Sequence, residues 1–222
     1  MATTIYSGSN DGYCFNSGTN WVTVRDANTS SSANSSLSSY AYAVRASVAS
    51  GRGGTNYALS RAFLEFDVSE VTHVPKSGQL RVHGHLTSIS DVIAVKGTQS
   101  SSLATSDFDS IEGWDGSSAD GSGAGNNASN VTTYSDLITS WNTSAYNDFT
   151  LTQQALVDIA GLTTFKVCLI DSVADLRDVT PVAPWGPVNY AGVRFSEYSG
   201  TSSDPALRLT EQDNSVFVGC NF

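Results

Sequence analysis

Hydrophobic and polar residues alternate with a period of two along most of this chain, and segments with a 3.6-residue period are rare. Alternation that is rich in β-branched and aromatic residues is typical of half-buried strands. The pattern predicts strands at residues 20–24, 40–48, 60–67, 78–87, 91–98, 147–152, 163–170, 189–198 and 205–210. This number of strands is enough for two packed antiparallel sheets, and the sequence therefore predicts an all-β sandwich.

The segment 79–86 shows the alternation most clearly, because its even-numbered residues are apolar or Gly and its odd-numbered residues include one Arg and two His. One face of this strand is expected in the core and the other in solvent. A helix is predicted only at 152–161, with Thr152 as its cap and Gly161 at its end. Stretches rich in Ser, Gly and Asn at 28–39, 50–55 and 113–130 are predicted to be surface loops.

The 222 residues contain 40% hydrophobic residues, which indicates a folded chain with a sizeable core. We find no internal repeat and no linker, and we therefore expect one domain at 1–210 followed by a tail at 211–222. Charged residues make up only 14%, against about 25% in an average domain. The net charge is -10, which opposes a nucleic-acid partner because binding to phosphates depends on clustered Lys and Arg.

The first residues include neither a basic region nor an apolar run, and no segment approaches the 18 apolar residues of a membrane span. We therefore expect a chain that is neither inserted in a membrane nor exported by a signal peptide. Cys14, Cys168 and Cys220 are odd in number and far apart, so neither a disulfide framework nor a metal knuckle is predicted. Cys168 lies in an apolar run and is expected in the core.

The tail consists of a polar spacer at 211–214 and an apolar segment at 215–222, in which Val216, Phe217, Val218 and Phe222 stand out. One alternative is that this segment adds an edge strand to its own sheet. The other is that it pairs with a neighbouring subunit, because an apolar strand without a partner favours aggregation. The second alternative makes these four residues candidates for assembly contacts in a homo-oligomer.

Charged residues cluster on the predicted strand 60–67, where Arg61, Glu65 and Asp67 share a face. With Arg194 and Glu197 they are expected to form charge pairs across neighbouring strands, which is more typical of a sheet than a catalytic acid and base. Asp67 is expected to close the turn that follows, through Ser69.

Metal and cofactor sites are not predicted. His83 and His85 share a strand face, but they and His73 do not make a convincing zinc site. Asp107, Asp109 and the loop that begins at Asp115 offer oxygens that suit calcium, but they lack the spacing of an EF-hand. The chain has neither a nucleophile motif nor a phosphate-binding loop, and we therefore expect a protein that is not an enzyme and has no cofactor.

Three of the four tryptophans lie in or beside predicted loops. Trp21 is expected in the core, whereas Trp114 with its neighbour Asp115, Trp141 and Trp185 are candidates for binding a glycan. Flat aromatic rings stack on sugars, and a carboxylate binds sugar hydroxyls. The alternative is that these rings close the open end of the sandwich.

Two stretches match a known family. They are Arg61-Ala-Phe-Leu-Glu-Phe-Asp67 and Val193-Arg-Phe-Ser-Glu-Tyr-Ser-Gly200, which leads into Asp204-Pro-Ala-Leu-Arg-Leu-Thr210, with a Leu-Arg-Val strand at 80–82 between them. Together they resemble the DNRLRE-type β-sandwich module. The resemblance implies a jelly-roll-like sandwich, found as a carbohydrate-binding accessory domain of secreted bacterial enzymes and as a single-domain protein of tailed bacteriophages.

The resemblance leads to two functional hypotheses. The first is a non-enzymatic structural protein of a tailed-phage virion that binds the capsid shell as decoration or cement, with a tail or fibre position as the variant. The second is a carbohydrate-binding or receptor-binding module whose partner is a surface glycan held by the loop tryptophans.

Overall fold

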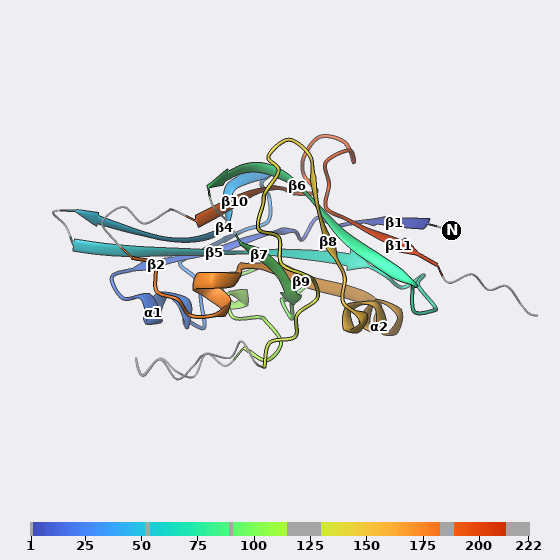
Figure 1. Ribbon diagram of the computed structural model, residues 1–222, viewed down its shortest axis with the longest axis horizontal. Coiled ribbons are helices and arrows are strands. Elements are labelled where there is room, and N and C mark those ends of the chain that lie inside the picture. The colour runs from blue at the N-terminus through green and yellow to red at the C-terminus, as the bar shows by residue number, and fades with distance from the viewer. Residues whose placement is uncertain (1, 52–53, 89–90, 115–129, 183–188, 212–222) are drawn as a thin grey trace, which may run out of the picture.

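The computed structural model shows an antiparallel β-sandwich with few helices, as the alternation predicted, and it describes residues 2–51, 54–88, 91–114, 130–182 and 189–211 (Figure 1). The strands are β1 (Ala2–Tyr6), β2 (Gly12–Gly18), β3 (Ser32–Asn34), β4 (Ser39–Gly51), β5 (Gly54–Asp67), β6 (Ser77–Ser88), β7 (Val92–Lys96), β8 (Tyr146–Thr150), β9 (Thr164–Asp171), β10 (Asn189–Arg194) and β11 (Ala206–Thr210). The helical segments are α1 (Trp21–Arg25), α2 (Gln153–Gly161) and the single turns η1 (Thr105–Asp107) and η2 (Ser172–Leu176).

The strands form two layers that are joined through β4. The upper layer consists of β1, β11, β6, β8, β10 and the first half of β4, and the lower layer consists of β3, β2, β5, β9, β7 and the second half of β4. β4 can belong to both because residues 39–46 pair with β10 and residues 45–51 pair with β5. β6 also changes partners along its length, from β8 and β11 in its first part to β10 in its second.

Two apolar cores lie on opposite faces of the lower layer. The first fills the space between the layers, where Leu80, Val82 and Phe149 meet Leu64 and Phe66. Its end is covered by α2, which contributes three buried residues. The second core lies below β5 and β9 and is covered by α1, η1 and η2. Strands buried on both faces do not alternate cleanly in sequence. Cys168 lies in this second core, as predicted.

The prediction for residues 20–24 was wrong, since they form the start of helix α1 and not a strand. The side chain of Asn20 caps this helix by accepting a hydrogen bond from the Thr23 backbone N–H at 3.0 Å. Trp21 is nevertheless in the core, as predicted. The helix predicted at 152–161 is confirmed as α2, with Thr152 as its N-cap.

Strands β1, β2 and β3 were not predicted, and β3 lies inside the segment that was predicted to be a loop. In β6 the predicted alternation holds for buried Leu80 and Val82 but ends at Gly84, since His83 is buried and Leu86 is 46% exposed. At this point β6 passes from β11 and β8 to β10. In the part of the chain that the structure describes, no helix has the length and apolar character needed to cross a bilayer.

Candidate functional site

The strongest concentration of charge in the described structure is a buried pair formed by Arg61 of β5 and Asp175 of η2. The Nε and Nη2 atoms of Arg61 donate to the two carboxylate oxygens of Asp175 at 2.8 and 2.7 Å. Nη1 and Nη2 also donate to the backbone oxygens of Phe108 and Arg25 at 2.7 and 3.0 Å. Both charged side chains are completely buried. Burial opposes the charged form of Arg61, but the Asp175 carboxylate outweighs it and raises the pKa of Arg61.

Aromatic rings and a second arginine surround this pair. The guanidinium of Arg61 lies 4.4 Å from the ring centroid of Phe108 and 4.2 Å from that of Trp114. Arg25 of α1 is also completely buried and donates from Nε to the backbone oxygen of Asp175 at 2.7 Å. Asp178 follows η2 with a φ of +56°, and its carboxylate accepts from the indole N–H of Trp21 at 3.1 Å.

These contacts tie α1, β5, η1 and η2 together below the lower layer. Four hydrogen bonds occupy the guanidinium of Arg61, and neither it nor Asp175 reaches solvent. A general acid or base must reach the substrate proton. The cluster of Arg25, Arg61 and Asp175, which we call the bracket, therefore has a structural role in this conformation.

The charge pairs predicted on β5 are partly wrong. Arg61 faces the second core and pairs with Asp175, whereas Glu65 faces Lys166 of β9, with 3.7 Å between its carboxylate oxygen and the ammonium nitrogen. Arg194 contacts Ser203 and the ring of Tyr198, not an acidic residue of β5. The turn prediction is confirmed, because the Asp67 carboxylate accepts from the backbone N–H and the hydroxyl of Ser69 at 3.0 and 2.6 Å.

The three histidines do not come together at one site. The Nδ1 atom of His83 lies 2.8 Å from the backbone oxygen of Gly84, and that of His73 lies 2.9 Å from the Thr72 hydroxyl. Among the described residues no group of three or more His, Cys, Asp or Glu side chains could hold a metal ion. Asp107 uses its carboxylate locally and accepts from the backbone N–H groups of Ser100 and Ala104, both at 2.8 Å.

The loop tryptophans occupy different environments. Trp141 is only 9% exposed, contacts Phe149 edge-on, and donates from its indole nitrogen to the backbone oxygen of Gly192 at 3.1 Å. Trp114 is half-buried against the arginines of the bracket. The described structure therefore does not bring these two rings together on an exposed surface. Asp115 and Trp185, the other glycan candidates, lie outside the described residues, and so do Val216, Phe217, Val218 and Phe222.

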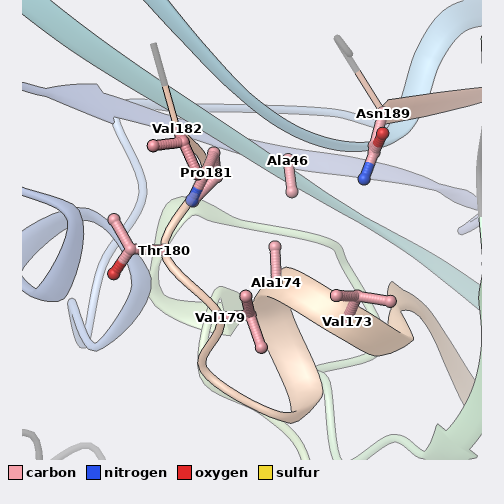
Figure 2. Close-up of a pocket in the computed structure, with 8 residues that line it drawn as sticks. All are labelled: Ala46, Val173, Ala174, Val179, Thr180, Pro181, Val182 and Asn189. Carbon is pink, nitrogen blue, oxygen red and sulfur yellow. The ribbon is translucent and has the colours of Figure 1, made fainter. Parts of the chain in front are cut away.

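An apolar pocket of about 190 Å³ lies between the second half of β4 and the segment that follows η2 (Figure 2). Ala46, Ala174 and Val179 form its walls, and Asn189 provides a polar group at its rim. None of the described residues that line it is acidic, basic or a thiol. The described lining can therefore hold an apolar group and offers no side chain suited to acid-base chemistry.

The edge of the upper layer is formed by β1, which pairs with β11 in the register Ala2 to Thr210 and Tyr6 to Ala206. Within the described part of the chain, no strand pairs with the other side of residues 2–6. Only Ile5 of this strand packs against the core, and the other side chains are exposed. Such an edge offers unpaired backbone groups to another strand.

No protein-family model matches this chain. No curated protein matches it either, so the resemblance to the DNRLRE-type module stays a prediction.

Sequence reasoning did not find Asp175 or Arg25 as members of the bracket. Asp175 is 114 positions from Arg61, and nothing in the spacing connects them. The available signal was Arg61 itself, because an arginine within the apolar run 58–66 predicts a buried charge that needs a partner.

Proposed function

We propose that this chain is a non-enzymatic structural protein of a tailed-phage virion that assembles through strand pairing and decorates or cements the capsid, with a tail or fibre position as the variant. The observation that carries the proposal is the outer edge of β1, with which no strand of the described residues pairs. The virion setting rests on the resemblance to the phage-encoded modules and on the chain's composition.

The register of β1 and β11 supports a way to assemble. Ala2 lies opposite Thr210, so the chain leaves β11 beside the N-terminal end of β1. The sequence that follows includes the apolar segment 215–222, which has the β-branched and aromatic composition of a strand. In the proposal this segment pairs with the β1 edge of a neighbouring copy, where backbone hydrogen bonds supply affinity. Several such contacts on one shell make weak individual contacts persist.

The assembly step is tested by light-scattering mass over a range of concentrations. The full chain is expected to form oligomers, and both a chain that ends at Glu211 and the F217D variant are expected to be monomeric. The matched control is V182D, which places the same charge at an apolar position that is 74% exposed, and it is expected to assemble like the unmodified chain. A full chain that is monomeric, or a truncated chain that still assembles, would overturn assembly through this segment.

The virion setting is tested separately on purified phage particles from the source that encodes the chain. Mass spectrometry is expected to find its peptides at a fixed ratio to the major shell protein. If washed particles contain none of these peptides, the virion proposal fails even if the chain assembles in solution.

A further inference from the structure

A polar junction lies where the turn between β1 and β2 meets the loop between β10 and β11. Asp11 of the turn is completely buried, and its Oδ1 atom accepts from the backbone N–H of Glu65 at 3.2 Å. The Ser196 hydroxyl of the loop donates to the backbone oxygen of Gly8 in the turn at 2.9 Å. These two residues are 188 positions apart in the sequence, so the junction connects the beginning of the sandwich to its last strands.

Four buried oxygen atoms gather at this junction without a hydrogen-bond partner in the described part of the chain. They are Ser7 Oγ, Asp11 Oδ2, Glu197 Oε2 and Asp204 Oδ1. Buried polar atoms in folded proteins nearly always have a partner. The strongest case is Asp11, because its whole side chain is shielded from water and Ser7 and Glu197 are the side chains beside its carboxylate. Four such oxygens at one place point to a ligand that they share.

The charges at the junction show which kind of ligand this is. Burial raises the pKa of Asp11 well above its usual value, and the neighbouring Glu197 carboxylate adds to the rise. Burial also raises the pKa of Glu197, and the Asp204 carboxylate adds to that rise. Among the described residues, no Lys, Arg or His forms an ion pair with any of these three carboxyl groups. A bound cation replaces their mutual repulsion with attraction.

We propose that this junction binds a calcium ion between Asp11 and Glu197. The Ser7 hydroxyl and the backbone oxygen of Gly8 lie beside these carboxylates and supply neutral ligands, and water completes the set of about six to eight oxygens that calcium takes. The side chains named here offer only oxygen, which disfavours metals that prefer thiolate or imidazole. Magnesium keeps several of its waters, so a buried set of mixed protein oxygens favours calcium.

Two carboxylates, a hydroxyl and a backbone oxygen make a different kind of site from the groups of three or more His, Cys, Asp or Glu side chains that the described residues lack. Asp204 contributes its negative charge to the site through Glu197. The ion holds the turn that follows β1 against the loop that precedes β11, and its ligands do not include the backbone groups along the outer edge of β1. Calcium binding therefore does not depend on assembly.

The test is a calorimetric titration of calcium chloride into the full chain, after treatment with EDTA and removal of the chelator, together with thermal unfolding. One ion per chain is expected to bind with a Kd of about 100 µM or lower. Calcium at about 1 mM is expected to raise the Tm by at least about 3 °C, and magnesium at the same concentration by less than about 1 °C.

The D11N and E197Q variants each remove one charged ligand and are expected to weaken calcium binding by about tenfold or more. The matched controls D136N and E70Q make the same changes at exposed positions and are expected to bind calcium within about twofold of the unmodified chain. In EDTA, D11N is expected to unfold at the same temperature as the unmodified chain or higher, because it removes a buried acid. If D11N does not fold, E197Q decides alone, since Glu197 is only half-buried.

Three results would overturn the proposal. The first is an unmodified chain that gives neither binding heat nor a change in Tm with calcium, in which case the junction holds protons and not a metal ion. The second is undiminished calcium binding by the folded variants, which would place the ion elsewhere. The third is an equal rise in Tm with magnesium, which would contradict the assignment to calcium.

Discussion

Replacing Arg61 with methionine removes the charge at the centre of the bracket while it keeps a long apolar side chain. In this variant the Asp175 carboxylate loses two hydrogen bonds, at 2.8 and 2.7 Å, in a position without access to water. The backbone oxygens of Phe108 and Arg25 also lose a donor. The expected result is a less stable fold, because a buried charge is left without its partner.

The size of the effect follows from this burial. Breaking a fully buried ion pair by removing one partner costs about 3–5 kcal/mol of unfolding free energy. For a chain of this length that corresponds to a fall in Tm of about 6–20 °C. The double variant R61M/D175L replaces both charges with apolar groups, and it is expected to recover at least about 2 kcal/mol relative to the sum of the two single variants.

Urea unfolding followed by tryptophan fluorescence measures these differences, and Trp114 is a local reporter because its ring centroid lies 4.2 Å from the Arg61 guanidinium. The matched control is R81M. Arg81 also donates from Nε to an aspartate at 2.8 Å, but the two side chains are 29% and 36% exposed. An exposed pair of this kind contributes about 0–1 kcal/mol.

Two results would refute the reasoning. If R61M costs no more than R81M, burial does not set the strength of these pairs. If the losses of R61M and D175L simply add in the double variant, the two side chains do not stabilise the fold as a pair, whatever their distance in the structure.

Three further predictions concern single positions. Burial raises the pKa of Asp171 to about 6, so the native state holds this proton more tightly than the unfolded state, and the carboxylate costs stability as the pH rises from about 4 to about 6. In urea unfolding, the unfolding free energy of D171N is therefore expected to rise by up to about 3 kcal/mol relative to that of the unmodified chain between pH 4 and pH 7. A difference between the two chains that does not change with pH would contradict this prediction. Burial raises the pKa of the Cys14 thiol to about 12 and that of the Cys168 thiol well above its usual value. In the C220S variant, neither thiol is therefore expected to react with a thiol reagent at pH 8 until urea is added. Rapid labelling of the native variant would contradict this prediction. A Cβ on Gly84 would overlap the backbone oxygen of Asn142, whereas one on Gly51 would meet no atom within 4 Å. G84A is therefore expected to lose about 2 kcal/mol or more and G51A less than about 0.5 kcal/mol in thermal unfolding, and equal losses would show that the close approach relaxes freely.

The strands that sequence reasoning found have one apolar face and one polar face. β6 and β11 place apolar residues toward the core between the layers and polar residues toward solvent, so a period of two is visible. β2 gives no such signal, because Cys14 packs in one core while Tyr13 packs against the other. β1 is an edge strand in which only Ile5 contacts the core, and its four exposed positions carry little pattern.

The candidate sites were less predictable than the strands, because each depends on pairing between distant strands. The edge of the upper layer depends on the register of β1 and β11, which places Ala2 opposite Thr210, and no local feature of the sequence sets that register. The loop tryptophans were predicted as glycan-binding candidates from their flanking residues alone. Trp141 shows why flanking residues are a poor guide. Although it precedes Asn142, its ring lies in the core, where its indole N–H donates to the backbone oxygen of Gly192. A loop-like composition predicts an irregular backbone, but it does not predict whether an aromatic side chain points toward solvent or toward the core.

The pairing of β1 with β11 sets an order for folding during synthesis. Ala2 leaves the ribosome before its partner Thr210 is made, which follows 208 positions later. At about 5–20 residues per second, the first strand therefore waits roughly 10–40 s for its neighbour. During this time both sides of β1 are open to strands of other nascent chains. Ile5 is the one large aliphatic side chain of β1, so the strand offers little apolar surface to other chains at this stage of biosynthesis.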